Sequence, residues 1–238
     1  MSSAAQIRAE VVALGDPERA ASSAWFFKTG PGEYGEGDVF AGVPVPVLRK
    51  LVRRFRGAPP AVVNTLLGDE LHEVRLLGLL LMVDGFERSD GGDRASWVQD
   101  YRDAVAAGRV DNWDLVDSSA RQVLGAWCQE SGDFGQLLEY AGSEELWERR
   151  VGIIGTHAYL MSGDPSATLA VATAVIDDRR DLIQKAFGWM LREMGKRVSR
   201  ETLTAYLDVH AAQMGRTALG YAVEHLDPDE RKHYRSLR

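Results

Sequence analysis

Helical segments recur along this chain at a spacing of roughly 40 residues, and this recurrence restricts the fold more than any other feature. The second helix of each expected pair begins at Glu70, Trp113, Glu144, Asp181 and Thr217. No segment alternates apolar and polar residues for long, and runs of β-branched residues are short. The sequence therefore predicts an all-α chain in which helix pairs stack into a solenoid with a concave groove.

Signals for helix starts and ends locate the individual helices. Ser2 or Ser3 can cap a first helix, and Asp16 followed by Pro17 opens the next. Further helices are expected over residues 44–56, 60–67, 70–86, 95–107, 113–129, 134–140, 144–161, 164–176, 181–196, 199–214, 217–225 and 230–238. No loop-rich linker separates two cores, so we expect one domain over residues 1–238.

Composition narrows the function classes. The net charge of −7 argues against nucleic-acid binding through total charge, although a local basic face is compatible with it. A single cysteine, Cys128, excludes an internal disulfide, and no two of the five scattered histidines have metal-ligand spacing beside a Glu, so we expect no metal. The longest apolar run, residues 76–83, is far too short to span a bilayer. We expect a cytoplasmic protein with no membrane partner.

A glycine-rich segment over residues 30–38 matches the dinucleotide-binding pattern G-x-G-x-x-G literally. No strand precedes it, Pro31 lies inside it, and Glu33, Glu36 and Asp38 would repel a phosphate. The segment is therefore interpreted as a turn-rich connector, and no nucleotide cofactor is expected.

Positive charge is concentrated in the expected helix over residues 44–56. Its apolar side chains form one stripe, which leaves most of its cations on the opposite side: Arg49, Lys50, Arg53, Arg54 and Arg56. These cations form either a solvated face or a phosphate-contacting face. The local excess of positive charge in an acidic protein favours the second.

The candidate chemistry begins in residues 111–121, at the expected start of a helix. Trp113, Asp117 and Arg121 fall on one stripe at helical spacing, which places an aromatic face, a carboxylate and a cation side by side. The alternative interpretation is a buried tryptophan with a surface ion pair between Asp117 and Arg121.

Two later segments resemble this one in composition. One is residues 147–150, which end at Arg150, and the other is residues 184–192, where Lys185, Trp189 and Arg192 share one face. Equivalent helices of a solenoid line the same groove, so these residues are expected to join the first set. Core packing of the tryptophans and solvation of the cations are the alternatives.

The motifs resemble those of the AlkD-type DNA alkylation repair family, HEAT-like alkylpurine DNA glycosylases. The resemblance rests on residues 112–118 (NWDLVDS), 147–150 (WERR), 184–193 (QKAFGWMLRE) and 28–44 (KTGPGEYGEGDVFAGVP), and it covers nearly the whole chain. It implies that Asp117 is the catalytic carboxylate, that Trp113 and Trp189 are the groove tryptophans, and that Arg150 contacts DNA. The resemblance places Phe26 where the family has a tyrosine near the damaged nucleotide, so any hydroxyl role is lost there, and stacking is the role still open to Phe26.

The implied activity is that of a monofunctional glycosylase that excises cationic N3- or N7-alkylpurines from duplex DNA, without metal or cofactor. Such a purine already carries a positive charge, and an ionised carboxylate stabilises the oxocarbenium-like sugar that forms as it departs. Lys185, Arg192 and the cluster of Arg49, Lys50 and Arg53 would neutralise phosphates. We expect a monomer. The alternative is a non-catalytic HEAT-repeat module that binds DNA structure or a protein partner.

Overall fold

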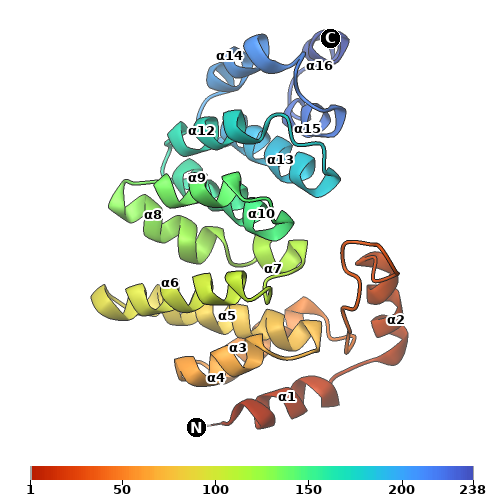
Figure 1. The fold of residues 1–238 in the computed structure, drawn as a ribbon, viewed down its shortest axis with the longest axis vertical. Helices are drawn as coiled ribbons and strands as arrows, with labels where there is room; N and C mark the ends of the chain where they lie inside the picture. Colours follow the sequence, from red (N-terminus) through yellow and green to blue (C-terminus); the bar gives the residue numbers. More distant parts are fainter. Residues whose placement is uncertain (1, 238) are drawn as a thin grey trace. The chain divides into compact units, whose positions relative to one another are not determined.

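The computed structural model describes residues 2–237, and helices joined by loops make up most of it, the connection over residues 27–44 being a long one (Figure 1). Extended pairing among these residues is limited to one bridge between Val39 and Leu71. The predicted all-α class is confirmed. The chain divides into two compact units, Met1–Ser119 and Ala120–Arg238, called here the N-terminal and the C-terminal unit. No helix within residues 2–237 is long and apolar enough to cross a membrane.

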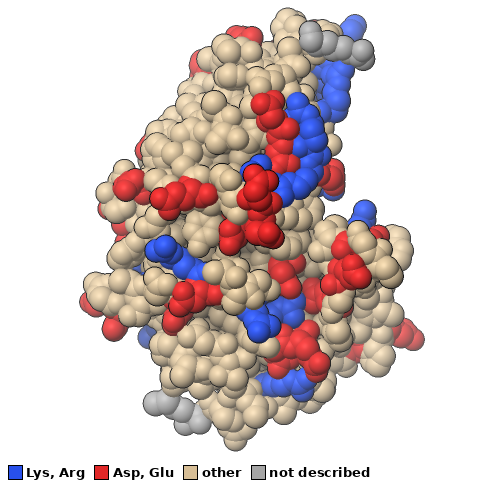
Figure 2. Space-filling model, viewed as in Figure 1, with Lys and Arg blue, Asp and Glu red and all other residues tan. Residues whose placement is uncertain are grey.

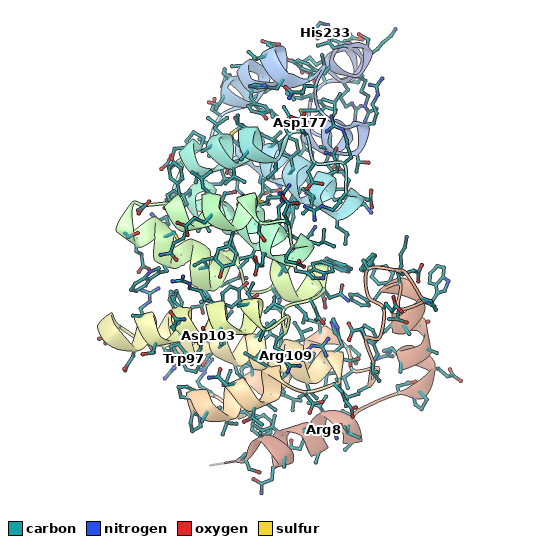
Figure 3. All side chains as sticks on the ribbon, in the orientation of Figure 1. Arg8, Trp97, Asp103, Arg109, Asp177 and His233 are labelled. Atoms are coloured by element: carbon teal, nitrogen blue, oxygen red, sulfur yellow. The ribbon has the colours of Figure 1, made fainter. Side chains whose placement is uncertain are left out.

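The N-terminal unit is built around one buried helix, α5. Its helices are α1 (Ala4–Ala13), α2 (Pro17–Phe26), α3 (Val45–Arg54), α4 (Pro60–Leu67), α5 (His72–Arg88), α6 (Gly91–Ala106) and α7 (Trp113–Asp117). Helices α3, α4 and α6 all pack against α5, whose residues are buried on several sides. Arg8 on α1 forms a 2.8 Å ion pair with Asp69, in the loop that leads into α5 (Figure 3).

Capping explains why the first two helices begin where the sequence predicts. The Ser3 hydroxyl accepts a hydrogen bond from the Gln6 backbone N–H, and the Gln6 side chain accepts one from the Ser3 backbone N–H. Asp16 accepts from the backbone N–H groups of Glu18 and Arg19, with Pro17 in the first turn. Both patterns satisfy N–H groups that a helix leaves unpaired at its start.

The C-terminal unit is built around α13. It contains a π-helical turn η1 (Arg121–Gly125), α8 (Ala126–Ser131), α9 (Gly135–Gly142), α10 (Leu146–Gly155), α11 (His157–Met161), α12 (Ser166–Val175), α13 (Asp181–Arg197), α14 (Arg200–His210), α15 (Arg216–Ala222) and α16 (Pro228–Ser236). Helices α10, α14 and α15 pack against α13. The α13–α15 contact is close because Gly188 has no side chain: a Cβ there would lie 2.7 Å from Tyr221 Cβ.

The predicted helix over residues 113–129 is wrong in its continuity. Helix α7 ends at Asp117, a turn follows, and Gly125 donates to the Ala120 carbonyl in the i→i+5 pattern of a π-helix before α8 begins. The Ser119 hydroxyl, which is buried, donates to the Leu115 carbonyl at 2.6 Å. Serine and threonine hydroxyls that bond back along a helix bend it, and here the helix is interrupted.

The predicted helix over residues 144–161 is interrupted in the same way. Thr156 separates α10 from α11, and its hydroxyl donates to the Ile153 carbonyl at 2.7 Å. The other predicted helices are observed, with ends shifted by a few residues. The segment over residues 30–38 is a series of turns, as predicted.

Candidate functional site

Helix α7 places Trp113 at its first position and Asp117 at its last, one turn apart on the same side. Asn112 fixes the start of this helix: it is fully buried, its Oδ1 accepts from the Trp113 backbone N–H at 2.8 Å, and its Nδ2 donates to Asp38 Oδ2 at 3.1 Å. Trp113 and Asp117 are both partly exposed. A short helix held at its N-terminus thus presents an indole and a carboxylate together at the surface of the N-terminal unit.

Aromatic rings from two other segments support the Trp113 indole. Phe27 stacks on Trp113 with 5.2 Å between ring centres and 13° between planes, and Phe40 stacks on Phe27 at 5.0 Å. Phe26 meets Trp113 edge to face at 6.0 Å, and 58% of Phe26 remains exposed. The structure therefore brings together three of the predicted site residues, Phe26, Trp113 and Asp117.

Below these rings lies a buried ionic network that the sequence analysis missed. His72 Nδ1 is 2.7 Å from Asp38 Oδ2, and His72 Nε2 is 2.8 Å from Asp114 Oδ2. Arg75 donates to Asp38 Oδ1 at 2.8 Å. Burial by itself lowers the pKa of His72, but hydrogen bonds and charges from Asp114 and Asp38 outweigh it and raise that pKa to about 9. His72 is therefore a cation at neutral pH.

The same network acts on Asp38 in the opposite direction. Burial raises the pKa of the Asp38 carboxyl, whereas hydrogen bonds and charges from His72 and Arg75 lower it, and the net pKa lies below its ordinary value. Asp38 belongs to the glycine-rich connector that resembles a phosphate-binding loop in sequence. Its carboxylate instead joins this connector to α5 and to the residue that caps α7.

In the C-terminal unit, α13 carries three of the predicted site residues. Trp189 is partly exposed and meets His157 edge to face at 6.0 Å. Lys185 forms a 2.7 Å ion pair with Asp181 one turn earlier. Arg192 pairs with Glu224, in the turn that follows α15. These two cations are therefore partly neutralised by carboxylates of their own unit.

His157, beneath Trp189, differs from His72 in its charge. Burial and the nearby charge of Arg121 lower the pKa of His157, and the Glu193 carboxylate, 4.0 Å away, only partly offsets them, so the pKa is about 4. The imidazole is neutral at pH 7. Trp189 thus contacts the uncharged ring of His157, whereas the rings stacked under Trp113 contact the charged ring of His72.

Arg150 lies inside the C-terminal unit and is 4% exposed. Its guanidinium donates to the Leu182 carbonyl in the first turn of α13 at 2.6 Å. A buried guanidinium bound in this way connects α10 with the helix that carries Lys185 and Trp189. The predicted contact between Arg150 and DNA stays a prediction, and this burial weighs against it.

The sequence profile of a family described as "DNA alkylation repair enzyme" matches residues 7–226. The chain belongs to this family. A search of the curated proteins gives no match. Among solved structures, the chain is similar to a "predicted DNA alkylation repair enzyme from Enterococcus faecalis", with 18% identity and a TM-score of 0.67 over 90% of this chain and 97% of that one.

These comparisons confirm the resemblance seen in the motifs and the α-α superhelical fold class. Membership of the DNA alkylation repair enzyme family gives the chain a role in DNA repair and makes it an enzyme of that class. The concave basic groove, the residue roles and the reaction stay predictions.

In this DNA alkylation repair enzyme, all of the predicted cluster of cations except Arg56 lies on α3. Arg49, Lys50 and Arg53 are exposed, as a DNA-contacting role requires. Arg54 pairs with Glu10 at 2.9 Å. On the face shown in Figure 2, acidic and basic side chains are interspersed.

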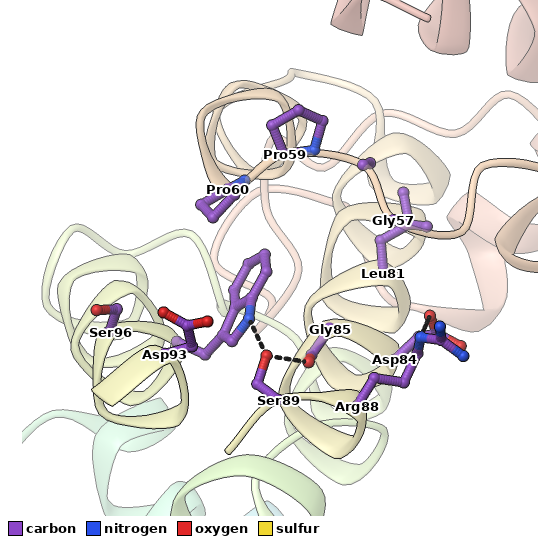
Figure 4. Close-up of a pocket in the computed structure, with 12 residues that line it drawn as sticks. Gly57, Pro59, Pro60, Leu81, Asp84, Gly85, Arg88, Ser89, Asp93 and Ser96 are labelled. Carbon is purple, nitrogen blue, oxygen red and sulfur yellow. Dashed lines mark hydrogen bonds and ion pairs between the residues drawn. The ribbon is translucent and has the colours of Figure 1, made fainter. Parts of the chain in front are cut away.

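Among the hollows on the N-terminal unit of this DNA alkylation repair enzyme, two bear on the candidate site and its surroundings. One, of about 560 Å³, lies beside Phe26 and Trp25, and the indole of Trp25 is 83% exposed. The other, of about 470 Å³, lies at the end of α5 opposite His72 (Figure 4). There the Trp97 indole donates to Ser89 Oγ at 3.3 Å. No predicted site residue lines the second hollow.

Proposed function

We propose that this DNA alkylation repair enzyme is a monofunctional DNA glycosylase. It would hydrolyse the N-glycosidic bond of cationic N3- or N7-alkylpurines in duplex DNA and leave an abasic site, acting in the cytoplasm as a monomer without metal or nucleotide cofactor. The observation that carries the proposal is α7, which presents Trp113 and Asp117 one turn apart on a partly exposed surface.

The proposed reaction needs an ionised carboxylate and does not need a general acid to protonate the leaving base. The alkylated purine is already cationic, so the C1′–N bond breaks with its electron pair moving onto the base, which leaves neutral. The sugar becomes oxocarbenium-like, and the Asp117 carboxylate stabilises this positive charge. A water molecule oriented by Asp117 then bonds to C1′ and loses a proton. The indole face of Trp113 attracts the same cationic groups, by about 0.5–2 kcal/mol.

The remaining residues would bind and orient the duplex. Arg49, Lys50 and Arg53 on α3, and Lys185 and Arg192 on α13, would contact phosphates. Phe26 would stack near the damaged nucleotide beside Trp113, and Trp189 would supply a second indole. The proposal treats residues 1–238 as one domain.

The test is release of N7-methylguanine from duplex DNA by wild type, Asp117→Asn and a control, Asp103→Asn. Asp103 is an exposed carboxylate on α6 that accepts a hydrogen bond from the Gln99 side chain. Wild type and Asp103→Asn should release base well above the uncatalysed rate. Asp117→Asn should release it at least about a hundredfold more slowly, which is the size of a lost electrostatic stabiliser. Its affinity for undamaged duplex, measured by fluorescence anisotropy, should be unchanged.

Two observations favour the alternative of a non-catalytic module that binds DNA structure or a protein. Phe26 lacks the tyrosine hydroxyl of the family, and the chain carries a net charge of −7. Under this alternative the wild type releases base at the uncatalysed rate, and Asp117→Asn changes neither release nor binding. The experiment above therefore separates the two functions.

A further inference from the structure

We propose that His72 is a positioning residue that holds α7, and with it the Trp113 indole, in the orientation that base excision needs. The inference rests on the proposed function for its link to excision. The orientation of Trp113 by His72 is a claim about geometry that can be tested without the reaction.

The first observation is that His72 lies between two carboxylates. His72 is 1% exposed in the first turn of α5, and its two ring nitrogens face Asp38 at 2.7 Å and Asp114 at 2.8 Å. A neutral imidazole has one N–H and can donate to one carboxylate, whereas an imidazolium donates to both. Between two ionised carboxylates the geometry therefore favours the cation, in agreement with the raised pKa of His72.

Asp114 depends on this cation. It directly follows Trp113 in α7, its Oδ2 bonds to His72, and its Oδ1 is buried without a hydrogen-bond partner among the described residues. Without the positive charge at His72, a mostly buried carboxylate would lose its compensation and move toward water. Because Asp114 is in the first turn of α7, that movement would turn the helix and Trp113 with it.

A second connection between His72 and Trp113 runs through stacked rings. The imidazole stacks on Phe40 with 4.5 Å between ring centres and 25° between planes, and it lies 5.1 Å from Phe27. Phe27 in turn stacks on the Trp113 indole. A cation against aromatic faces is attracted to them, so the charge of His72 also keeps this column together.

The other charged groups around His72 explain why its loss would not be compensated. Arg75, one turn later on α5, donates to Asp38 Oδ1 at 2.8 Å and to Asp111 Oδ1 at 3.3 Å. Its positive charge therefore compensates these two carboxylates. Asp114 faces His72 and not Arg75. A neutral residue at position 72 would therefore leave Asp38 paired and Asp114 unpaired.

The matched control is the neighbouring residue Glu73, which is also buried. Its carboxylate accepts from the backbone N–H groups of Ala41, Gly42 and Val43 at 2.8, 2.8 and 3.1 Å. It anchors the segment that contains Phe40 but does not bond to α7. His72→Gln removes the cation that pairs with Asp114 of α7, whereas Glu73→Gln removes a buried charge that has no hydrogen bond to α7.

Three readouts test the proposal on the full chain. The first is the single-turnover rate of N7-methylguanine release, the second is affinity for undamaged duplex, and the third is the ¹⁹F resonance of Trp113 in protein labelled with 5-fluorotryptophan, assigned with Trp113→Phe. His72→Gln should slow release by about tenfold to a hundredfold, as a misplaced catalytic group does, with affinity changed by less than about twofold. It should also shift the Trp113 resonance, and by more than Glu73→Gln does, because Glu73 reaches Trp113 only through the stacked rings of Phe40 and Phe27.

Equal slowing of release by both variants, with an unmoved Trp113 resonance, would overturn the proposal and leave His72 a purely structural residue. If His72→Gln fails to fold, the wild-type Trp113 resonance is followed from pH 7 to pH 10.5. It should shift with a midpoint near the His72 pKa of about 9, and a flat profile would contradict the proposal. If wild type releases no base while the resonance shifts as expected, the glycosylase proposal fails and the positioning of Trp113 by His72 stands.

Discussion

The Phe27 ring lies parallel to the Trp113 indole, with 5.2 Å between ring centres and 13° between planes. Phe27 closes α2 as its C-terminal cap, and the glycine-rich connector follows it. One face of the indole is thus covered by protein, and Trp113 remains partly exposed. The exposed part is what a bound nucleotide would meet in the proposed glycosylase.

Replacing Phe27 with leucine removes the stacked ring while retaining apolar volume. We expect a loss of about 1–2 kcal/mol in the free energy of unfolding, since an aromatic pair contributes about 0.5–1.5 kcal/mol beyond its buried area. Base release should slow by about tenfold because the indole is less well oriented. Urea unfolding and single-turnover release measure the two effects. The control is Phe134→Leu, which breaks an aromatic pair with Tyr159 in the C-terminal unit; a similar slowing in that variant would contradict the prediction.

The raised pKa of His72 predicts a loss of stability at alkaline pH. In the folded protein the pKa is about 9, against 6.5 as the ordinary value, so the folded state binds a proton that the unfolded state releases. This contribution is fully present below about pH 6.5 and is lost as the pH rises through 9. It amounts to roughly 3 kcal/mol at most, because each tenfold gain in proton affinity on folding corresponds to about 1.4 kcal/mol.

Unfolding free energies of wild type and His72→Gln between pH 6 and pH 10 measure this contribution. The difference between the two proteins should be largest near pH 6 and should shrink as the pH passes 9. A difference that stays constant over this range would show that His72 is not charged in the folded protein.

Arg150 and Lys185 should respond differently to truncation. Arg150 is buried and bonds to the Leu182 carbonyl, so Arg150→Ala should cost about 1–3 kcal/mol of stability through the unpaired carbonyl and lost packing. Lys185 is partly exposed and paired with Asp181, so Lys185→Ala should change stability by less than about 1 kcal/mol.

Lys185→Ala should instead weaken duplex binding and reduce the salt slope of the binding constant by about one. Thermal unfolding and anisotropy titrations at several salt concentrations separate the two residues.

Local signals in the sequence were sufficient to predict where most of the helices begin and end. Ser3 and Asp16 cap helices as predicted, because a cap depends on residues within one turn. The interruption at Ser119 could not be predicted in this way. A serine that bonds back to Leu115 looks the same in sequence as one that faces water, and only burial against Tyr101 distinguishes them.

The candidate site was predicted only in part, for a related reason. Motifs identified Trp113 and Asp117, which are four residues apart, but His72 was one of five scattered histidines. Its carboxylate partners, Asp38 and Asp114, are 34 and 42 residues away in the chain. No periodicity links residues at such separations, so the cation beneath Trp113 became visible only once the fold brought them together. Arg150 shows the reverse: the motif predicts a DNA contact, which stays a prediction, and only the fold shows that the Arg150 side chain is buried.

Close packing between α13 and α15 predicts opposite effects of alanine at two glycines. A Cβ at Gly188 would overlap the Ala218 carbonyl and lie 2.7 Å from Tyr221 Cβ, so Gly188→Ala must push the two helices apart. Overpacking of this kind costs about 1–3 kcal/mol. Gly220, in α15, has no heavy atom within 4 Å of a Cβ, and Gly220→Ala should stabilise that helix by about 0.5–1 kcal/mol. Urea unfolding of the two variants checks the signs. A neutral Gly188→Ala would mean that α13 and α15 are packed less closely in solution, and Trp189, next along α13, would then be held less firmly as well.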